Sequence, residues 1–279
     1  MAIKVSGTSV INDSRRLENI ASVDSTTAAS MTAAGVGGTP SGTNLFDAPV
    51  KGDGSGGLRF AGYNLGSGGA QYSNGSGTYT VPSNTPYVKV FVTGGGAGGS
   101  GAKPTQLAWF NSGGGGASST IYGFIAVNAG DSITYSVGAK GNKGVNQSNG
   151  TSGGTSTLTK GSTTLTATGG SFAPGGQYPN AAGGAAGTAS STGSLLEEEV
   201  IYAGTAGTVP PGNAFTGGSG GTSLYGPGAV GVLNSNADNA INYGSGGAGG
   251  ASNTTGNGNV NGSDGASGYI VIERWSGVE

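Results

Sequence analysis

Residues 87–99 read Tyr-Val-Lys-Val-Phe-Val-Thr-Gly-Gly-Gly-Ala-Gly-Gly, an alternating apolar run that passes directly into a glycine block. The alternation predicts a β-strand with Val88, Val90 and Val92 on one face. The block behind it has almost no side chains to bury, and glycine loses more entropy on folding than any other residue. Similar blocks occur at 113–116 and 246–250. How such blocks fold therefore decides the structure of the chain.

Glycine accounts for 63 of the 279 residues, roughly three times its usual share of about 7%. Sequence rich in glycine and serine is typical of flexible linkers and disordered tracts. Disorder usually accompanies high net charge, whereas this chain has 9% charged residues and a net charge of −2. The glycines also lack the strict Gly-X-Y repeat of collagen. The composition favours a folded chain of strands and glycine segments.

The residue types that are missing exclude several kinds of chemistry. The chain has no cysteine and no histidine, which excludes disulfides, thiol nucleophiles, Cys/His zinc sites and histidine acid–base catalysis. No basic cluster exceeds Arg15-Arg16, which argues against nucleic-acid binding. No apolar run is long enough to cross a membrane, and the first residues lack the apolar region of a signal peptide. We expect no enzyme, no metal site and no cofactor.

Alternating runs elsewhere predict further strands. The expected strands are residues 78–81, 87–92, 121–127, 133–137, 155–159, 163–168 and 269–275. The first two are expected to pair as a hairpin across 82–86, and the two Thr-rich runs to pair across 160–162. Between residues 168 and 268 there is almost no alternation, and only Ser194-Leu195-Leu196-Glu197 fits a short helical turn with a capping box.

Extended glycine segments readily adopt the polyproline II conformation, with three residues per turn and no internal hydrogen bonds. In a bundle, their outward N–H and C=O groups pair with neighbouring segments. Such close approach demands glycine, because a Cβ would hold the segments apart. The sequence therefore predicts a mostly β and irregular fold, in which β-strands and packed polyglycine II helices form a glycine-rich domain with loops at its ends.

The chain divides into three parts by composition. Residues 1–45 form an N-terminal segment, 46–76 a polar connector and 77–279 the glycine-rich domain. Residues 1–45 contain too few apolar side chains to bury a core of their own, so they are expected to gain order by docking or by oligomerising. A frayed terminus is the alternative.

The stretch from Gly77 to Trp275 resembles the glycine-rich domain of bacteriophage tail-fibre and receptor-recognising tip proteins. A series of short motifs in order carries the resemblance: 78–82 (Thr-Tyr-Thr-Val-Pro) followed by 88–96, then 113–116, 127–131 (Val-Asn-Ala-Gly-Asp), 133–138, 165–170 and 265–272. Residues 3–7 and 10–20 are similar to the opening of phage tail-fibre and virion proteins.

The resemblance implies a tail-fibre protein of the virion, made in the host cytoplasm, homo-oligomeric and most simply trimeric, without nucleic-acid binding or membrane insertion. Its N-terminus would attach to phage tail or baseplate proteins, through residues Ile3, Val5, Ile11, Arg15, Arg16, Leu17 and Ile20. Loops at the far end of the glycine domain would bind a host surface glycan or outer-membrane protein. The aromatic candidates for that contact are Trp109, Phe110, Phe172, Tyr178, Tyr202, Phe215 and Tyr243.

Other interpretations stay open. The aromatic residues could instead fill gaps between glycine layers, and the chain could be a structural virion component, such as a decoration or baseplate subunit, without receptor binding. A polysaccharide depolymerase needs two carboxylates about 5–10 Å apart, whereas Asp131, Asp238 and Asp264 are single acids in turn-like contexts. An ice-binding protein would need a regular threonine spacing across successive blocks, and the sequence lacks one. Glu197 to Glu199 suggest a solvated acidic loop.

Overall fold

The computed structural model describes residues 3–5, 8–11, 50–52, 58–60, 63–65, 69–102, 110–174, 182–196, 200–208, 216–232, 235–252 and 260–277. The chain forms two compact units, Met1–Tyr63 and Asn64–Gly277, so the larger unit takes in part of the expected connector. In the smaller unit two antiparallel pairs of short strands are described: β1 (Ile3–Val5) with β2 (Thr8–Ile11), and β3 (Val50–Gly52) with β4 (Leu58–Phe60). None of the described residues forms a helix.

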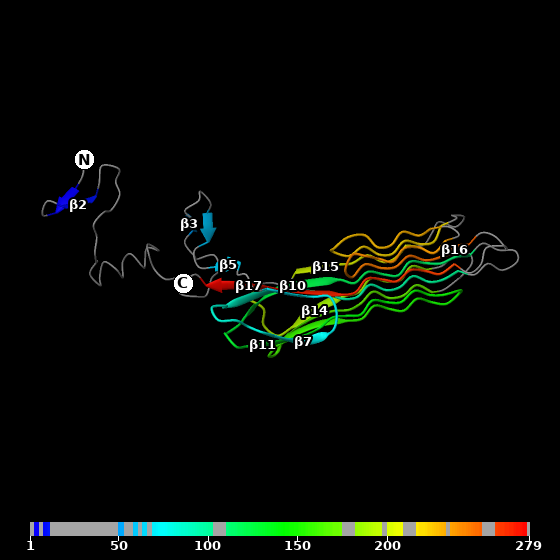
Figure 1. The fold of residues 1–279 in the computed structure, drawn as a ribbon, viewed down its shortest axis with the longest axis horizontal. Coiled ribbons are helices and arrows are strands. Elements are labelled where there is room, and N and C mark those ends of the chain that lie inside the picture. The colour runs from blue at the N-terminus through cyan, green and yellow to red at the C-terminus, as the bar shows by residue number, and fades with distance from the viewer. Residues whose placement is uncertain are drawn as a thin grey trace. The chain divides into compact units, whose positions relative to one another are not determined.

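The larger unit contains two antiparallel sheets (Figure 1). The six-stranded sheet has the order β15-β10-β8-β17-β5, and β6 also pairs with β17. Its strands are β5 (Tyr63–Leu65), β6 (Ala70–Tyr72), β8 (Tyr87–Thr93), β10 (Thr120–Ala126), β15 (Val200–Tyr202) and β17 (Tyr269–Gly277). The five-stranded sheet has the order β14-β13-β12-β11-β7. Its strands are β7 (Ser76–Thr80), β11 (Ser132–Ser136), β12 (Ser156–Lys160), β13 (Thr163–Ala167) and β14 (Ala189–Thr192).

The two sheets pack face to face around one hydrophobic core. Val88, Val90 and Val92 are fully buried, which confirms their predicted common face. The same cluster includes Ile133 and Leu158, which come from the five-stranded sheet. Alternation along each strand therefore sends one set of side chains into the core and the other set to the surface.

All seven expected strands are present, and β12 and β13 form the predicted hairpin around Gly161, whose φ is +58°. The predicted hairpin between residues 78–81 and 87–92 is wrong. Strand β7 pairs with β11, whereas β8 lies in the other sheet, between β10 and β17. Both strands have an apolar face, and these faces meet across the core instead of lying side by side in one sheet. The chain crosses between the sheets at residues 81–86.

The region without alternation contains elements that the sequence pattern did not reveal. The short strands β14 and β15 lie there, as does β16 (Ala251–Ser252), which pairs with β9 (Phe110–Asn111). The helical turn expected at 194–197 is absent as far as Leu196, and Glu197 to Glu199 lie outside the described residues. These strands have two to four residues, too few to produce a detectable period.

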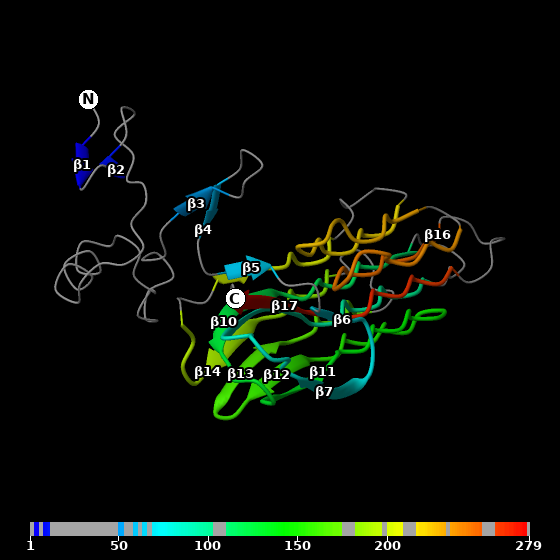
Figure 2. The same ribbon diagram turned by 60° about the vertical axis from the view of Figure 1, so that its left-hand side comes forward.

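The glycine segments leave the ends of the strands and run side by side away from the sheets (Figures 1 and 2). Successive backbone N–H groups of residues 95–102 donate hydrogen bonds to three neighbouring segments in turn. Residues 95, 98 and 101 donate to residues 154, 151 and 148; residues 96, 99 and 102 donate to 266, 263 and 260; residues 97 and 100 donate to 116 and 113. The period of three equals the number of residues per turn of polyproline II. Neighbouring chains thus satisfy the backbone of this segment without side chains.

The innermost segments are fully buried. Every residue of 92–102, 112–121 and 244–252 is buried. A Cβ added at Gly96 would overlap the carbonyl oxygen of Ser245, and one added at Gly99 would overlap that of Ala248. Glycine is required at these positions because two backbones lie in direct contact there.

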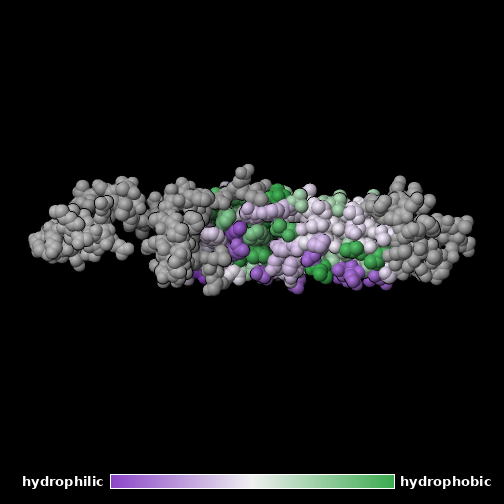
Figure 3. Space-filling view, turned by 90° about the horizontal axis from the view of Figure 1, so that it is seen from above, coloured by the Kyte–Doolittle hydropathy of each residue, from purple (hydrophilic) through white to green (hydrophobic). Residues whose placement is uncertain are grey.

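Side chains replace backbone acceptors at the periphery of the bundle. Thr208 Oγ1 accepts from the N–H of Ser219, and Thr205 Oγ1 accepts from that of Thr222, each at 2.7 Å. These threonines are three residues apart, so both lie on the same side of their segment. Most of the surface over the glycine segments is pale in Figure 3, with green and purple residues along one edge. The glycine segments thus offer little strongly hydrophobic or charged surface on that side.

Candidate binding surface at the far end of the glycine segments

The glycine segments end together on the side away from the sheets, which we call the far end. Backbone hydrogen bonds hold the segments together near this end. Ser112 N–H donates to Gly250 O at 3.0 Å, and Gly218 N–H donates to Ser112 O at 2.9 Å. Gly114 N–H donates to Thr208 O at 3.2 Å. Chain segments distant in sequence therefore reverse direction at one common surface.

A small sheet lies at the far end. Strands β9 and β16 pair there, and Ala102 forms a bridge with Val260 (Figure 1). The two pairings hold the flanks of residues 103–109 and 253–259 next to each other. The ends of both stretches are therefore fixed by backbone hydrogen bonds.

Buried serines connect the segments near this end. Ser112 Oγ donates to Gly101 O at 2.8 Å, and Ser100 Oγ donates to Ala173 O. Both serines are fully buried. A buried hydroxyl needs a partner, and here a neighbouring carbonyl supplies it without adding bulk. The flanks of residues 175–181 are thereby fixed to the same scaffold.

The turn at residues 145–148 also lies at the far end, since Gly101 N–H donates to Ser148 O at 3.1 Å. Ser148 Oγ accepts from Val145 N–H at 2.9 Å and donates to Val145 O at 2.6 Å. Asn146 has φ +57°, a conformation that asparagine tolerates well, and Val145 is about half exposed. Our sequence interpretation missed this turn, although its Asn-Gln-Ser-Asn run is a turn signal.

Five of the seven aromatic candidates lie at the far end or in stretches flanked by it. Phe110 belongs to β9, and Phe172, which is 40% exposed, lies two residues before the described flank at residue 174. Trp109, Tyr178 and Phe215 lie outside the described residues, each in a stretch whose described flank is at this surface. The structure thus brings together segments spread over more than half of the sequence.

Tyr202 and Tyr243 lie elsewhere, so their expected place among the far-end loops is wrong. Tyr202 ends β15, with its ring 6.0 Å from that of Tyr122. Tyr243 stacks on Tyr269 at 4.1 Å with ring planes 2° apart. The reason is that residues 242–245 form a turn where the glycine segments join the sheets, and Gly244 N–H donates there to Ser267 O, two residues before β17. Tyr243 thus packs on a strand residue.

The attachment candidates are only partly described. Ile3 and Val5 belong to β1 and Ile11 to β2. The other four, Arg15, Arg16, Leu17 and Ile20, lie outside the described residues.

Two carboxylates of the larger unit pair with lysines. Asp131 contacts Lys160 at 3.1 Å, and Asp264 contacts Lys140 at 2.6 Å. In the described part of the chain, no three His, Cys, Asp or Glu residues gather as metal ligands. Nor does that part contain a helix long and apolar enough to cross a membrane.

Asp264 stabilises the glycine segments in a pH-dependent way. Burial raises the pKa of its carboxyl, but hydrogen bonds from Lys140 Nζ and from the Lys143 N–H outweigh burial, so the pKa lies below its ordinary value. Asp264→Asn is expected to lower the free energy of unfolding by roughly 0.5 kcal/mol at pH 7, because Lys140 is largely exposed.

The sign of the pH effect follows from the lowered pKa. The stabilisation is present above about pH 4 and is lost as the pH falls through the folded-state pKa. The difference in unfolding free energy between the parent chain and Asp264→Asn, measured with urea, is therefore expected to be smaller at pH 2.5 than at pH 7. A difference that is unchanged at pH 2.5 would contradict this assignment.

Comparison with known proteins identifies the domain. The family model described as a glycine-rich domain matches residues 72–275. No curated protein matches the chain.

Proposed function

We propose that this chain, which belongs to the glycine-rich domain family, is a tail-fibre protein of a bacteriophage. Its N-terminal residues attach to the tail or baseplate. Its far end binds a glycan or protein on the host surface. The resemblance of the motifs between Gly77 and Trp275 to phage tip proteins supports the phage assignment.

The observation that carries the binding role is the convergence of segment ends at one surface. Six pairs of flanks meet there: 102 and 110, 145 and 148, 174 and 182, 208 and 216, 232 and 235, and 252 and 260. Loops on a rigid scaffold are the usual location of recognition residues, because they can vary without disturbing the fold. The aromatic candidates in or next to these stretches suit contact with sugars or apolar pockets.

The scaffold supports this role through its rigidity. We interpret the glycine segments as packed polyglycine II helices, an interpretation supported by the threefold rotation of the hydrogen-bond partners of residues 95–102. Each segment is held by several neighbours, so the flanks of the loops keep a fixed spacing. A trimer joined through the N-terminal residues would present three such surfaces, and multivalency would strengthen weak single contacts.

Phage adsorption tests the proposal. Residues 103–109 and 175–181 are replaced in the phage by Gly/Ser stretches of equal length, which leave the described scaffold intact. We expect the adsorption rate on host cells to fall by about 100-fold, because multivalent binding magnifies each weakened contact.

The control phage carries Ser162→Asn, in the exposed turn between β12 and β13, and is expected to adsorb like the parent phage. Particle counts and the thermal unfolding of the purified chains verify that assembly and folding are equal. Unchanged adsorption of the loop variant would reject the binding role and leave a structural virion component as the function.

A further inference from the structure

The outer face of the six-stranded sheet carries a cluster of aromatic side chains. Strand alternation places them opposite the buried core residues, and cross-strand register brings Phe91 opposite Tyr122 and Lys89 opposite Phe124. On the other side of β8, Glu273 lies opposite Lys89. We call this set the aromatic face; its members are Lys89, Phe91, Tyr122, Phe124, Tyr202, Tyr269, Glu273 and Trp275.

The rings of the aromatic face form a nearly continuous platform. Tyr122 lies 5.3 Å from Phe91 and 6.0 Å from Tyr202, measured between ring centroids. Phe124 lies 5.8 Å from Trp275 in an edge-to-face arrangement. Most of these side chains are half-buried and Tyr202 is 43% exposed. Part of each ring is thus in contact with solvent, which is uncommon for so many neighbouring aromatics.

Two turns of the glycine region extend the platform. Tyr225 packs edge-on against Tyr269 at 5.4 Å, beside the stacked pair of Tyr243 and Tyr269. Burial raises the pKa of the Tyr225 hydroxyl above its ordinary value. The platform therefore continues from the sheet to the sheet end of the glycine segments, on the other side from the far end.

The charges on this face balance. Lys89 Nζ lies over the rings of Phe91, Tyr122 and Phe124 at 4.7, 5.0 and 5.7 Å from their centroids, as in cation–π contacts. The carboxylate of Glu273 offsets this positive charge across the β8–β17 pair. Single-stranded nucleic acid also stacks on aromatic platforms, but it needs a cationic groove along its backbone. The balanced charge favours a neutral partner.

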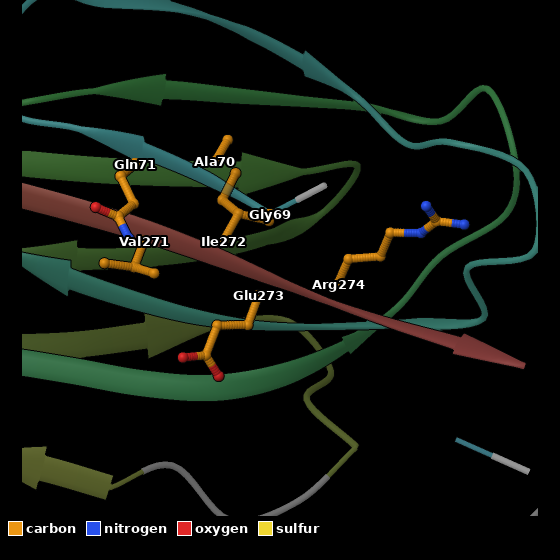
Figure 4. Close-up of a pocket in the computed structure, with 7 residues that line it drawn as sticks. All are labelled: Gly69, Ala70, Gln71, Val271, Ile272, Glu273 and Arg274. Atoms are coloured by element: carbon orange, nitrogen blue, oxygen red, sulfur yellow. The ribbon is translucent and has the colours of Figure 1, made fainter. Parts of the chain in front are cut away.

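Polar groups that suit hydroxyl-rich ligands lie beside the rings. The buried Trp275 Nε1–H has no hydrogen-bond acceptor within the part of the chain that the structure describes. A hollow of about 290 Å³ opens beside β17 and is lined by Gly69, Gln71 and Glu273 among others. Figure 4 shows Glu273 and Arg274 extending to opposite sides of β17. Apolar surface with a few convergent polar groups is the usual composition of a small-ligand site.

We propose that the aromatic face binds a neutral, extended hexose chain. The sugar rings would lie with their C–H faces on the aromatic rings, while their hydroxyls pair with the Glu273 carboxylate. The site is separate from the far-end loops and does not depend on their role.

Tryptophan fluorescence tests the proposal on the full chain. The chain has two tryptophans, so Trp109→Phe leaves Trp275 as the only reporter. Maltohexaose, cellohexaose, mannohexaose and the oligonucleotide dT20 are titrated separately, and calorimetry repeats each titration. We expect a saturable change with at least one of the three hexasaccharides and none with dT20.

Variants separate this site from the far end. Tyr122→Ala is expected to weaken hexasaccharide binding about tenfold, the factor that corresponds to loss of one stacked ring. Tyr202→Ala, at an exposed strand end, is expected to weaken it severalfold without leaving a cavity in the core. Val230→Ala is the control, an exposed apolar residue that belongs neither to the aromatic face nor to the far-end candidates, and is expected to bind like the parent.

Thermal unfolding of every variant shows whether it is folded. Three results would each overturn the proposal: no response to any of the three hexasaccharides, binding of dT20 in their place, or weakened binding in Val230→Ala but not in Tyr122→Ala and Tyr202→Ala.

Discussion

Gly96→Ala is expected to prevent the glycine segments from packing, with a loss of more than about 5 kcal/mol in the free energy of unfolding. The new Cβ would overlap the carbonyl oxygen of Ser245 and lie 2.9 Å from that of Gly244. Both obstacles are backbone atoms of a fully buried segment, so no side chain can rotate away. The segments would have to separate, which would break their shared hydrogen bonds.

The matched control is Gly130→Ala in the turn before β11. A Cβ there meets nothing within 4 Å, but the residue has φ +85°. The expected cost is about 1–2 kcal/mol, because alanine only has to adopt a left-handed conformation. Soluble expression and thermal unfolding followed by circular dichroism compare the two variants. Equal stability of Gly96→Ala and Gly130→Ala would show that direct backbone contact is not what demands glycine at Gly96.

Leu158→Ala is expected to lower the free energy of unfolding by about 2–5 kcal/mol. Leu158 is fully buried between the sheets and pairs with Leu165 across β12 and β13. Removing its side chain leaves a cavity that the surrounding strands cannot close completely. The glycine segments continue directly from these strands, so we expect sheets and segments to unfold in one transition at a lower temperature.

Leu196→Ala is the control for this second variant, since Leu196 is 44% exposed. Its stability is expected to stay within about 0.5 kcal/mol of the parent. Urea unfolding gives both values. If Leu158→Ala shifted only one of two separate transitions, the sheets and the glycine segments would be independent folding units.

The sequence alone was sufficient to locate the seven strands that alternate clearly, but not the shorter strands, and it did not assign all of the seven to sheets. The alternation in residues 87–92 and 269–275 predicted both strands, since one buried face imposes a period of two. It did not show that β7 and β8 lie in different sheets. An apolar face packs equally well beside a neighbouring strand or across a core, and only the complete set of strands decides between these arrangements.

The sequence likewise predicted the position of some residues of the candidate site but not of others. Phe110 lies in β9 at the far end as expected, while Tyr243 folds back to stack on Tyr269. Both follow or precede glycine-rich stretches, and nothing local indicates at which end of the bundle a turn occurs. The aromatic face went unrecognised because its members come from strands β8, β10, β15 and β17, which are far apart in the sequence.

The sequence by itself determined that this chain needs neighbouring backbones for its core. A block such as residues 94–99 offers no side chains for burial, so its N–H and C=O groups have to find partners in other segments. Only the tertiary structure decided which segments those are: residues 95–102 pair in turn with 148–154, 260–266 and 113–116. The physical reason is that glycine segments are nearly identical in side-chain chemistry. The strands that begin and end them select the partners, and only the folded sheets fix where each strand lies.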